Sequence, residues 1–94
     1  AAIEELIKGV AKEEGQHNIR ANSIAIGVIE TGIFLRLREQ GVFDDQWVAQ
    51  VKQNLPLQRF GSPKEVAKMA LFLASSASGY TTGQLIPVDG GYGL

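Results

Sequence analysis

The sequence contains no cysteine, one histidine and one methionine among its 94 residues. The absence of cysteine excludes disulfides and thiolate metal sites, and a single histidine excludes a histidine metal cluster within the chain. The net charge of −1, with no run of Lys or Arg, provides no long-range field for nucleic acid or anionic lipid. No apolar run approaches the roughly 20 residues of a membrane helix, and no signal peptide is visible. We therefore expect no metal, no nucleic acid and no membrane as partners.

The length and composition are those of one small globular domain. Hydrophobic residues make up 45% of the chain and charged residues 20%, which is ordinary for such a domain. The chain opens at Ala1 within a helical pattern that has no capping residue in front of it. We therefore expect the beginning of the polypeptide to lie upstream of Ala1.

The first third of the chain reads as a helix followed by a strand. An apolar stripe predicts a helix over residues 1–15, with Gly15 as its left-handed stop. The apolar segment Ile19–Ile26 predicts a strand buried between two helix layers. Asn22 is polar within that strand and needs hydrogen-bond partners if it is buried. The only histidine, His17, lies between the two elements, where we interpret it as a solvated turn residue and not as a base.

The middle of the chain, from Gly32 to Leu57, reads as short helical pieces separated by glycine. Asp44 is a plausible N-cap for a helix over Asp45–Asn54, in which Trp47 is interpreted as packing. A lid over a binding site has this pattern. An ordinary surface excursion has the same pattern, so both interpretations stay open.

The last third begins with a clear helix start. Ser62 and Glu65 have capping-box spacing, and Pro63 occupies the first helical position. The helix over residues 63–75 is apolar nearly all round, which predicts burial on two sides, one against the sheet. We assign the other side to a partner subunit or to further parts of the same protein. A second strand follows at 84–88, where Pro87 favours an edge or terminal position.

Two strands joined through a helix predict a parallel pair with a right-handed crossover. Such a pair is too small to form a domain, so the pattern predicts one edge of a larger α/β, doubly wound parallel sheet. An isolated 94-residue peptide should then be poorly folded or oligomeric. Ligands in such sheets bind beyond the carboxyl ends of the strands, which directs attention to the loop Gly27–Thr31.

The sequence resembles the C-terminal part of a short-chain dehydrogenase/reductase. The segment Ala1–Leu6 is similar to the helix that follows the family's Tyr-x-x-x-Lys motif. Further similar segments occur in family order and at matching spacing: Asn18–Ala25, Gly27–Thr31, Arg59–Ala67, Leu73–Ser76, Tyr80–Gln84 and Val88–Gly91. The resemblance covers essentially the whole chain but only somewhat more than a third of the family's usual length. It implies that residues 1–94 are the C-terminal segment of a single Rossmann-like domain.

The resemblance implies binding of NAD or NADP and hydride transfer to or from a carbonyl or alcohol carbon. It places Ile26, Gly27, Ile29 and Thr31 at cofactor-binding positions. Gly27 and Thr31 match positions near the nicotinamide, and the backbone of Ile29 matches a contact to its carboxamide. The Thr31 hydroxyl matches a contact to the carboxamide or a phosphate. The alternative is that Gly27 only forms a turn and Thr31 only caps a helix.

Three departures from the family matter. Ile26 and Gly32 stand where the family usually has proline, and both changes should loosen the loop because proline would restrict φ. The family's catalytic Ser, Tyr and Lys are absent, and by alignment the Lys would immediately precede Ala1. Glu30 is interpreted as a solvated carboxylate and cannot replace them. We therefore predict no catalytic residue within the chain and no activity for the 94 residues alone.

The resulting expectation is an oxidoreductase seen as its C-terminal part, with a small-molecule carbonyl or alcohol substrate. Its closest resemblance is to 3-oxoacyl-carrier-protein reductases, which suggests reduction of a 3-oxoacyl thioester. The family implies a cytoplasmic homo-oligomer, a dimer or tetramer, assembled through residues 1–15, 63–75 and 84–88. The alternatives are a non-catalytic fragment that serves as an oligomerisation module, and a binding module for an unrelated ligand.

Overall fold

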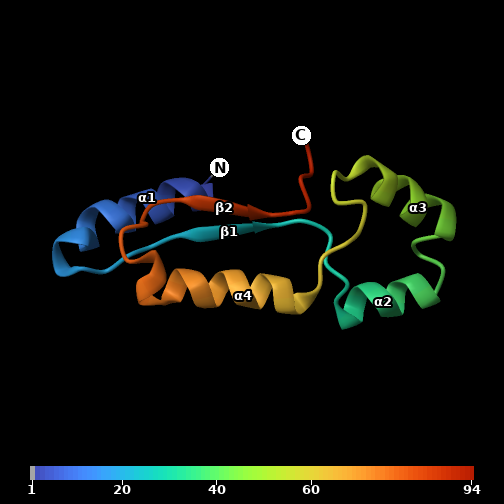
Figure 1. Cartoon of the computed structure of the whole chain (residues 1–94), viewed down its shortest axis with the longest axis horizontal. Coiled ribbons are helices and arrows are strands. Elements are labelled where there is room, and N and C mark those ends of the chain that lie inside the picture. Colours follow the sequence, from blue (N-terminus) through green and yellow to red (C-terminus); the bar gives the residue numbers. More distant parts are fainter. Residues whose placement is uncertain (1) are drawn as a thin grey trace. The chain divides into compact units, whose positions relative to one another are not determined.

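A computed structural model describes residues 2–94 (Figure 1). The elements in chain order are α1 (Ala2–Glu14), η1 (Gly15–His17), β1 (Ser23–Ile26), α2 (Gly32–Glu39), α3 (Asp45–Asn54), α4 (Pro63–Ala74), η2 (Ser76–Ser78) and β2 (Leu85–Val88). They fall into two compact units. The first unit runs to Ala25 and includes Ala67–Pro87, and the second unit contains Ile26–Val66 and Val88–Leu94.

Local capping signals place the helix starts where the sequence predicts them. The Asp44 carboxylate accepts a hydrogen bond from the Trp47 N–H at 2.7 Å, so Asp44 caps α3, whose predicted bounds are confirmed. At α4, the Glu65 N–H donates to Ser62 Oγ at 3.4 Å, and the Ser62 N–H donates to Glu65 Oε1 at 3.0 Å. This reciprocal pair is the predicted capping box, with Pro63 as the first helical residue.

The two strands are parallel, as predicted. The Ser23 N–H donates to the Gln84 carbonyl oxygen at 2.9 Å, and the Gly27 N–H donates to that of Val88 at 3.0 Å. Residue numbers rise together along both strands, whose arrows point the same way in Figure 1. The predicted strand over Ile19–Ile26 is too long at its beginning, since β1 starts at Ser23. Before that residue, the Ala21 N–H donates to the side-chain hydroxyl of Thr82 at 3.1 Å, where a strand residue would donate to a backbone carbonyl oxygen of the neighbouring strand.

The residue that adopts the left-handed conformation after α1 is not the predicted one. The helix ends at Glu14 and continues into the 3-10 turn η1. Gly15 lies in that turn, and the left-handed residue is Asn18, with φ 58°. An asparagine tolerates this conformation better than most residues, so it ends the turn in place of the predicted glycine. His17 is exposed, as expected for a solvated turn residue.

Side chains from the start of the first unit's strand segment hold the loop over residues 75–82. Arg20 Nη1 donates to Ser78 Oγ at 3.0 Å and to the Thr81 carbonyl oxygen at 3.2 Å. Asn22 donates to the same Thr81 oxygen at 3.0 Å and accepts from the Gln84 N–H at 3.0 Å. The expectation that Asn22 has hydrogen-bond partners is therefore confirmed. The role of Arg20 was not predicted, because its partners are distant in sequence.

The second unit has an aromatic core. Phe34, Val48, Leu55 and Phe60 are its buried residues, from α2, α3 and the segment after α3. The Phe43 ring stacks on Phe34 with centroids 5.3 Å apart, and Trp47 stacks on Phe43 at 4.9 Å. Trp47 therefore packs, as expected, while it stays 39% exposed.

Helix α4 has no buried residue, so the predicted burial on two sides does not occur within the described chain. Its half-buried positions are 65, 66, 69 and 73, which lie on one face at helical spacing. Leu71 and Phe72 on the helix remain 72% and 46% exposed. The prediction of burial on two sides is wrong for this single chain, because the described residues pack against only one face of α4. What covers the other face stays a prediction.

Candidate functional site

The loop Gly27–Thr31 lies in the second unit, immediately after β1. Two other segments of the same unit meet it. Val88 accepts the hydrogen bond from the Gly27 N–H, and Gly61 forms an isolated parallel bridge with Ile29. Three segments distant in sequence therefore determine the backbone of the candidate site.

Gly27 is required by the close approach of Asp89. A Cβ built on Gly27 would lie 2.8 Å from both Cα and Cβ of Asp89. Gly27 is not in the left-handed region, so a turn conformation does not explain it. Glycine is therefore needed at position 27 because a side chain there would clash with Asp89. The contact to a nicotinamide, which the resemblance implies, stays a prediction.

The bridge to Gly61 determines which way the backbone of Ile29 faces. The Gly61 N–H donates to the Val28 carbonyl oxygen at 3.0 Å, and the Glu30 N–H donates to the Gly61 carbonyl oxygen at 2.9 Å. In a strand-like segment the groups of successive residues alternate in direction. The N–H and C=O of Ile29 therefore point away from Gly61. Within residues 2–94 the Ile29 N–H has no acceptor, and its carbonyl oxygen accepts from the Thr31 N–H at 2.8 Å.

Thr31 is the N-cap of α2. Its Oγ1 accepts a hydrogen bond from the Phe34 N–H at 3.1 Å, which confirms the capping interpretation. Capping uses the hydroxyl as an acceptor and leaves its O–H available as a donor. The side chain is exposed. Capping and ligand binding by Thr31 are therefore compatible.

The two positions at which the family usually has proline lie on either side of this loop. Ile26 is 56% exposed at the end of β1, and Gly32 is the first residue of α2. Hydrogen bonds from the N–H groups of Gly27, Glu30 and Thr31 restrain the loop without proline. The predicted loosening stays a prediction, and these bonds act against it.

Residues 2–94 contain no cluster of three His, Asp or Glu side chains that could hold a metal ion. Glu30 takes part in the bridge through its backbone, and its carboxylate forms no ion pair with a described residue. None of the helices in this part of the chain is long and apolar enough to cross a membrane.

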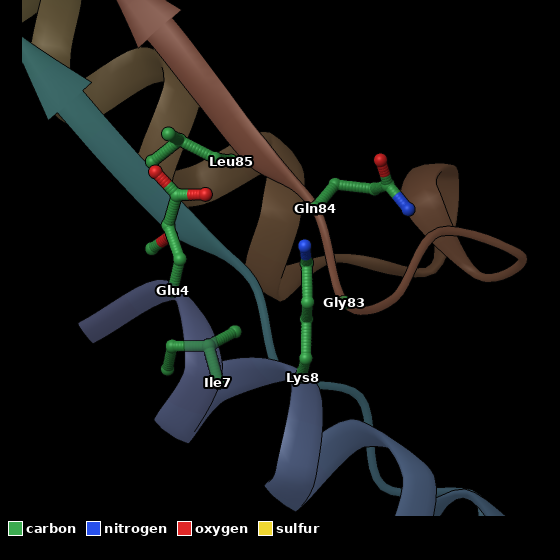
Figure 2. Close-up of a pocket in the computed structure, with 7 residues that line it drawn as sticks. Glu4, Ile7, Lys8, Gly83, Gln84 and Leu85 are labelled. Carbon is green, nitrogen blue, oxygen red and sulfur yellow. The ribbon is translucent and has the colours of Figure 1, made fainter. Parts of the chain in front are cut away.

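A hollow lies in the first unit, between α1 and the strands (Figure 2). Its empty space, much of it open to solvent, amounts to about 170 Å³, and its lining residues are Glu4, Ile7, Lys8, Ser23, Gly83, Gln84 and Leu85. Figure 2 shows the side chains of Glu4 and Lys8 extending from α1 toward β2. The buried Ser23 Oγ has no hydrogen-bond partner in the described chain. The hollow is open, no residue of the loop Gly27–Thr31 lines it, and we assign it no role.

Comparison with known proteins identifies the family. A family model described as enoyl-(acyl carrier protein) reductase matches residues 1–93. The chain is 45% identical over 84 residues to the 3-oxoacyl-(acyl-carrier-protein) reductase FabG of Chlamydia trachomatis, which covers 89% of the chain and 32% of the relative. The chain belongs to the short-chain dehydrogenase/reductase family. It spans about a third of the length of the curated relatives it matches.

Solved structures of family members have the same fold. A 3-oxoacyl-(acyl-carrier protein) reductase from Brucella melitensis superposes with a TM-score of 0.86 at 34% identity, covering 99% of the chain and 32% of the neighbour. An NADPH-bound short-chain oxidoreductase from Pseudomonas aeruginosa, with an atypical catalytic centre, gives 0.82 at 41% identity, covering 97% and 35%. The α/β, Rossmann-like fold predicted from the sequence is therefore confirmed.

The sequence led to the loop but missed two of the residues that hold it in this family member. Gly61 and Asp89 occur in segments that resemble the family, yet no role was predicted for either. Arg59 was also missed, although its two terminal guanidinium nitrogens, Nη1 and Nη2, donate to the two carboxylate oxygens of Glu65 at 2.8 Å each. The Arg59 hydrogen bond, together with the bond from the Ser62 N–H, lowers the pKa of Glu65 to about 2. An Arg and a Glu six residues apart have no standard helical spacing, so the sequence held no signal for this pair.

Proposed function

We propose that the chain is the C-terminal part of an NAD(P)-dependent oxidoreductase and forms the nicotinamide-facing wall of its active site. The observation that carries the proposal is the backbone of Ile29, whose N–H has no acceptor among the described residues while Gly61 binds the residues on both sides of it. A carboxamide needs one donor for its oxygen and one acceptor for its NH₂ group. The Ile29 N–H can donate, and the Ile29 carbonyl oxygen keeps a second lone pair beside the bond from Thr31.

The cofactor would supply the hydride, and the residues of this chain would bind and orient its ring. Thr31 supports this assignment because its hydroxyl can donate to a carboxamide or a phosphate while it caps α2. Ile26 is exposed beside the loop and offers apolar contact to a flat ring. The NADPH-bound relative from Pseudomonas aeruginosa supports a nicotinamide cofactor and does not decide between NAD and NADP for this chain.

The proposed reaction is hydride transfer between the cofactor and a carbonyl or alcohol carbon, with a 3-oxoacyl thioester as the leading substrate. Relatives named as 3-oxoacyl reductases support that substrate. The family model's description favours a second candidate, reduction of an enoyl thioester. We assign no acid or base to the described residues, so the 94 residues alone should be inactive.

The test uses the full-length protein and titrates it with NADH and NADPH, following cofactor fluorescence. Binding of one of them is expected, and no binding of either would refute the proposal. Steady-state oxidation of the cofactor with a 3-oxoacyl thioester, and separately with an enoyl thioester, then distinguishes the two substrates. Loss of cofactor only with the enoyl thioester would refute the leading substrate.

The alternative, a non-catalytic oligomerisation module, is tested by intact mass and by native mass. A catalytic protein should have roughly three times the 10.1 kDa of these residues, because relatives are about three times as long. A mature protein of 10.1 kDa would favour the module. Assembly as a homo-oligomer is part of the proposal, and the exposed Leu71 and Phe72 of α4 support it.

A further inference from the structure

A compact clamp of side chains surrounds Gly61, the residue that pairs with the candidate loop. The Glu65 carboxylate accepts from Nη1 and Nη2 of the Arg59 guanidinium, and its Oε1 also accepts from the Ser62 N–H at 3.0 Å. Arg59 and Ser62 lie on either side of Gly61 along the chain. One carboxylate therefore holds the residues before and after the bridge. Arg59, Ser62 and Glu65 together form this clamp.

The segment that carries the clamp is anchored independently. Phe60 is 3% exposed in the aromatic core of the second unit, where its ring lies edge-on to Phe34. Arg59 Nη1 also donates to the Phe60 carbonyl oxygen at 3.2 Å. The clamp thus connects a buried ring to the start of α4, and Gly61 lies between these two anchors.

The fit between Gly61 and the loop is tight. A Cβ built on Gly61 would lie 2.7 Å from Ile29 Cδ1. The Gly61 N–H and C=O bond the residues on either side of Ile29. A displacement of Gly61 is therefore transmitted to the direction of the Ile29 N–H and C=O groups.

We infer that the clamp is a positioning device, which orients the Ile29 backbone toward the carboxamide of a nicotinamide cofactor. None of its three side chains is assigned a contact with the cofactor, and each acts through Gly61. The inference rests on the proposed function, because it requires the Ile29 backbone to bind the cofactor. Arg59 and Glu65 should therefore affect binding of the nicotinamide half of the cofactor and leave binding of its ADP-ribose half unchanged.

The test compares two ligands in the full-length protein. One is the bound nicotinamide dinucleotide, and the other is ADP-ribose, or its 2′-phosphate, which lacks the nicotinamide ring. Calorimetry measures both affinities for the wild type and for Arg59→Met, which keeps the apolar stem and removes the guanidinium. We expect Arg59→Met to weaken dinucleotide binding by about threefold to tenfold, the equivalent of one hydrogen bond, and to leave ADP-ribose binding unchanged.

Two further clamp variants and one control variant separate the role of the clamp from general destabilisation. Glu65→Gln keeps an acceptor for the Ser62 N–H but loses the charge. It should weaken dinucleotide binding by less than Arg59→Met does and leave ADP-ribose binding unchanged. Asp45→Asn breaks another exposed ion pair of the second unit, the 3.6 Å contact with Arg38, and should change neither affinity. Arg59→Lys keeps the positive charge but cannot donate from two nitrogens at once, so it should weaken dinucleotide binding less than Arg59→Met does.

The outcomes separate the inference from the proposed function. Equal losses for both ligands, or no loss in Arg59→Met and Glu65→Gln, would overturn the positioning role while the proposed function stands. A wild-type protein that binds neither dinucleotide would overturn the proposed function, and the inference with it. A loss confined to the dinucleotide, absent in Asp45→Asn, supports both.

Discussion

Replacing Gly27 by alanine tests whether the candidate loop depends on close approach to Asp89. The added Cβ would lie 2.8 Å from Asp89 Cα, where carbon atoms in contact are normally about 3.5–4.0 Å apart. The contact is therefore short by about 0.7–1.2 Å, and the atom that must move belongs to the backbone. Asp89 cannot retreat freely, because the residues on either side of it are bonded to other segments: the Val88 carbonyl oxygen accepts from the Gly27 N–H at 3.0 Å, and the Gly90 carbonyl oxygen accepts from the Leu57 N–H at 3.1 Å.

The expected result is a destabilisation of about 1–3 kcal/mol, typical of an overpacked contact. In a domain of 150–250 residues this lowers the melting temperature by roughly 2–12 °C. The bond from the Gly27 N–H to the Val88 carbonyl oxygen should lengthen, so the Gly27 amide should also exchange faster with solvent. Thermal unfolding of the full-length protein and hydrogen exchange measure the two effects.

Gly32→Ala is the matched control. It also adds one methyl group beside the loop, but a Cβ there meets no atom within 4 Å, and φ is not left-handed. We expect it to be neutral or to stabilise by about 0.4–1 kcal/mol. Equal melting temperatures for Gly27→Ala and Gly32→Ala would refute the argument that Asp89 requires glycine at position 27.

Three further predictions concern other parts of the chain. Arg20→Met should destabilise by about 1.5–3 kcal/mol, because it removes charge-assisted hydrogen bonds to part-buried acceptors, and amide exchange over Ser75–Thr82 should quicken; unchanged exchange there would contradict the role of Arg20. Gly9→Ala should stabilise α1 by about 0.5–1 kcal/mol in thermal unfolding, because its Cβ meets no atom within 4 Å, and a loss of stability would disprove the open position. Glu65 should titrate at about 2 by carboxyl-carbon NMR, and Arg59→Met should raise that pKa toward 4.5. Its folded-state pKa is lowered, so its stabilising contribution is complete above pH 4.5 and is lost as the pH falls through about 2.

Several local elements could be predicted from sequence because their signals lie within a few residues. The cap at Asp44 and the capping box at Ser62 each connect a side chain to a backbone N–H three residues away. The bounds of α3 follow from such a signal. The conformation predicted for Gly15 was wrong because Asn18 can end the same turn.

The roles of residues in the loop could be predicted only in part. The sequence located Gly27–Thr31 and identified Thr31 as a possible cap, which the structure confirms. It could not show that Gly27 accommodates Asp89, 62 positions later, or that Gly61 turns the Ile29 backbone outward. Those contacts depend on where the chain returns, and no local pattern encodes a return over such distances.

By itself, the sequence determined the starts of α3 and α4, the parallel α/β class and the family, because capping, periodicity and ordered motifs are local or linear properties. Only the tertiary structure decided how the site is held. It placed Gly61 and Asp89 against the loop and brought Arg59 to Glu65, and it left one face of α4 exposed. The physical reason is that close packing and paired hydrogen bonds act between segments that meet in space, and their partners are set by the fold and not by spacing along the chain.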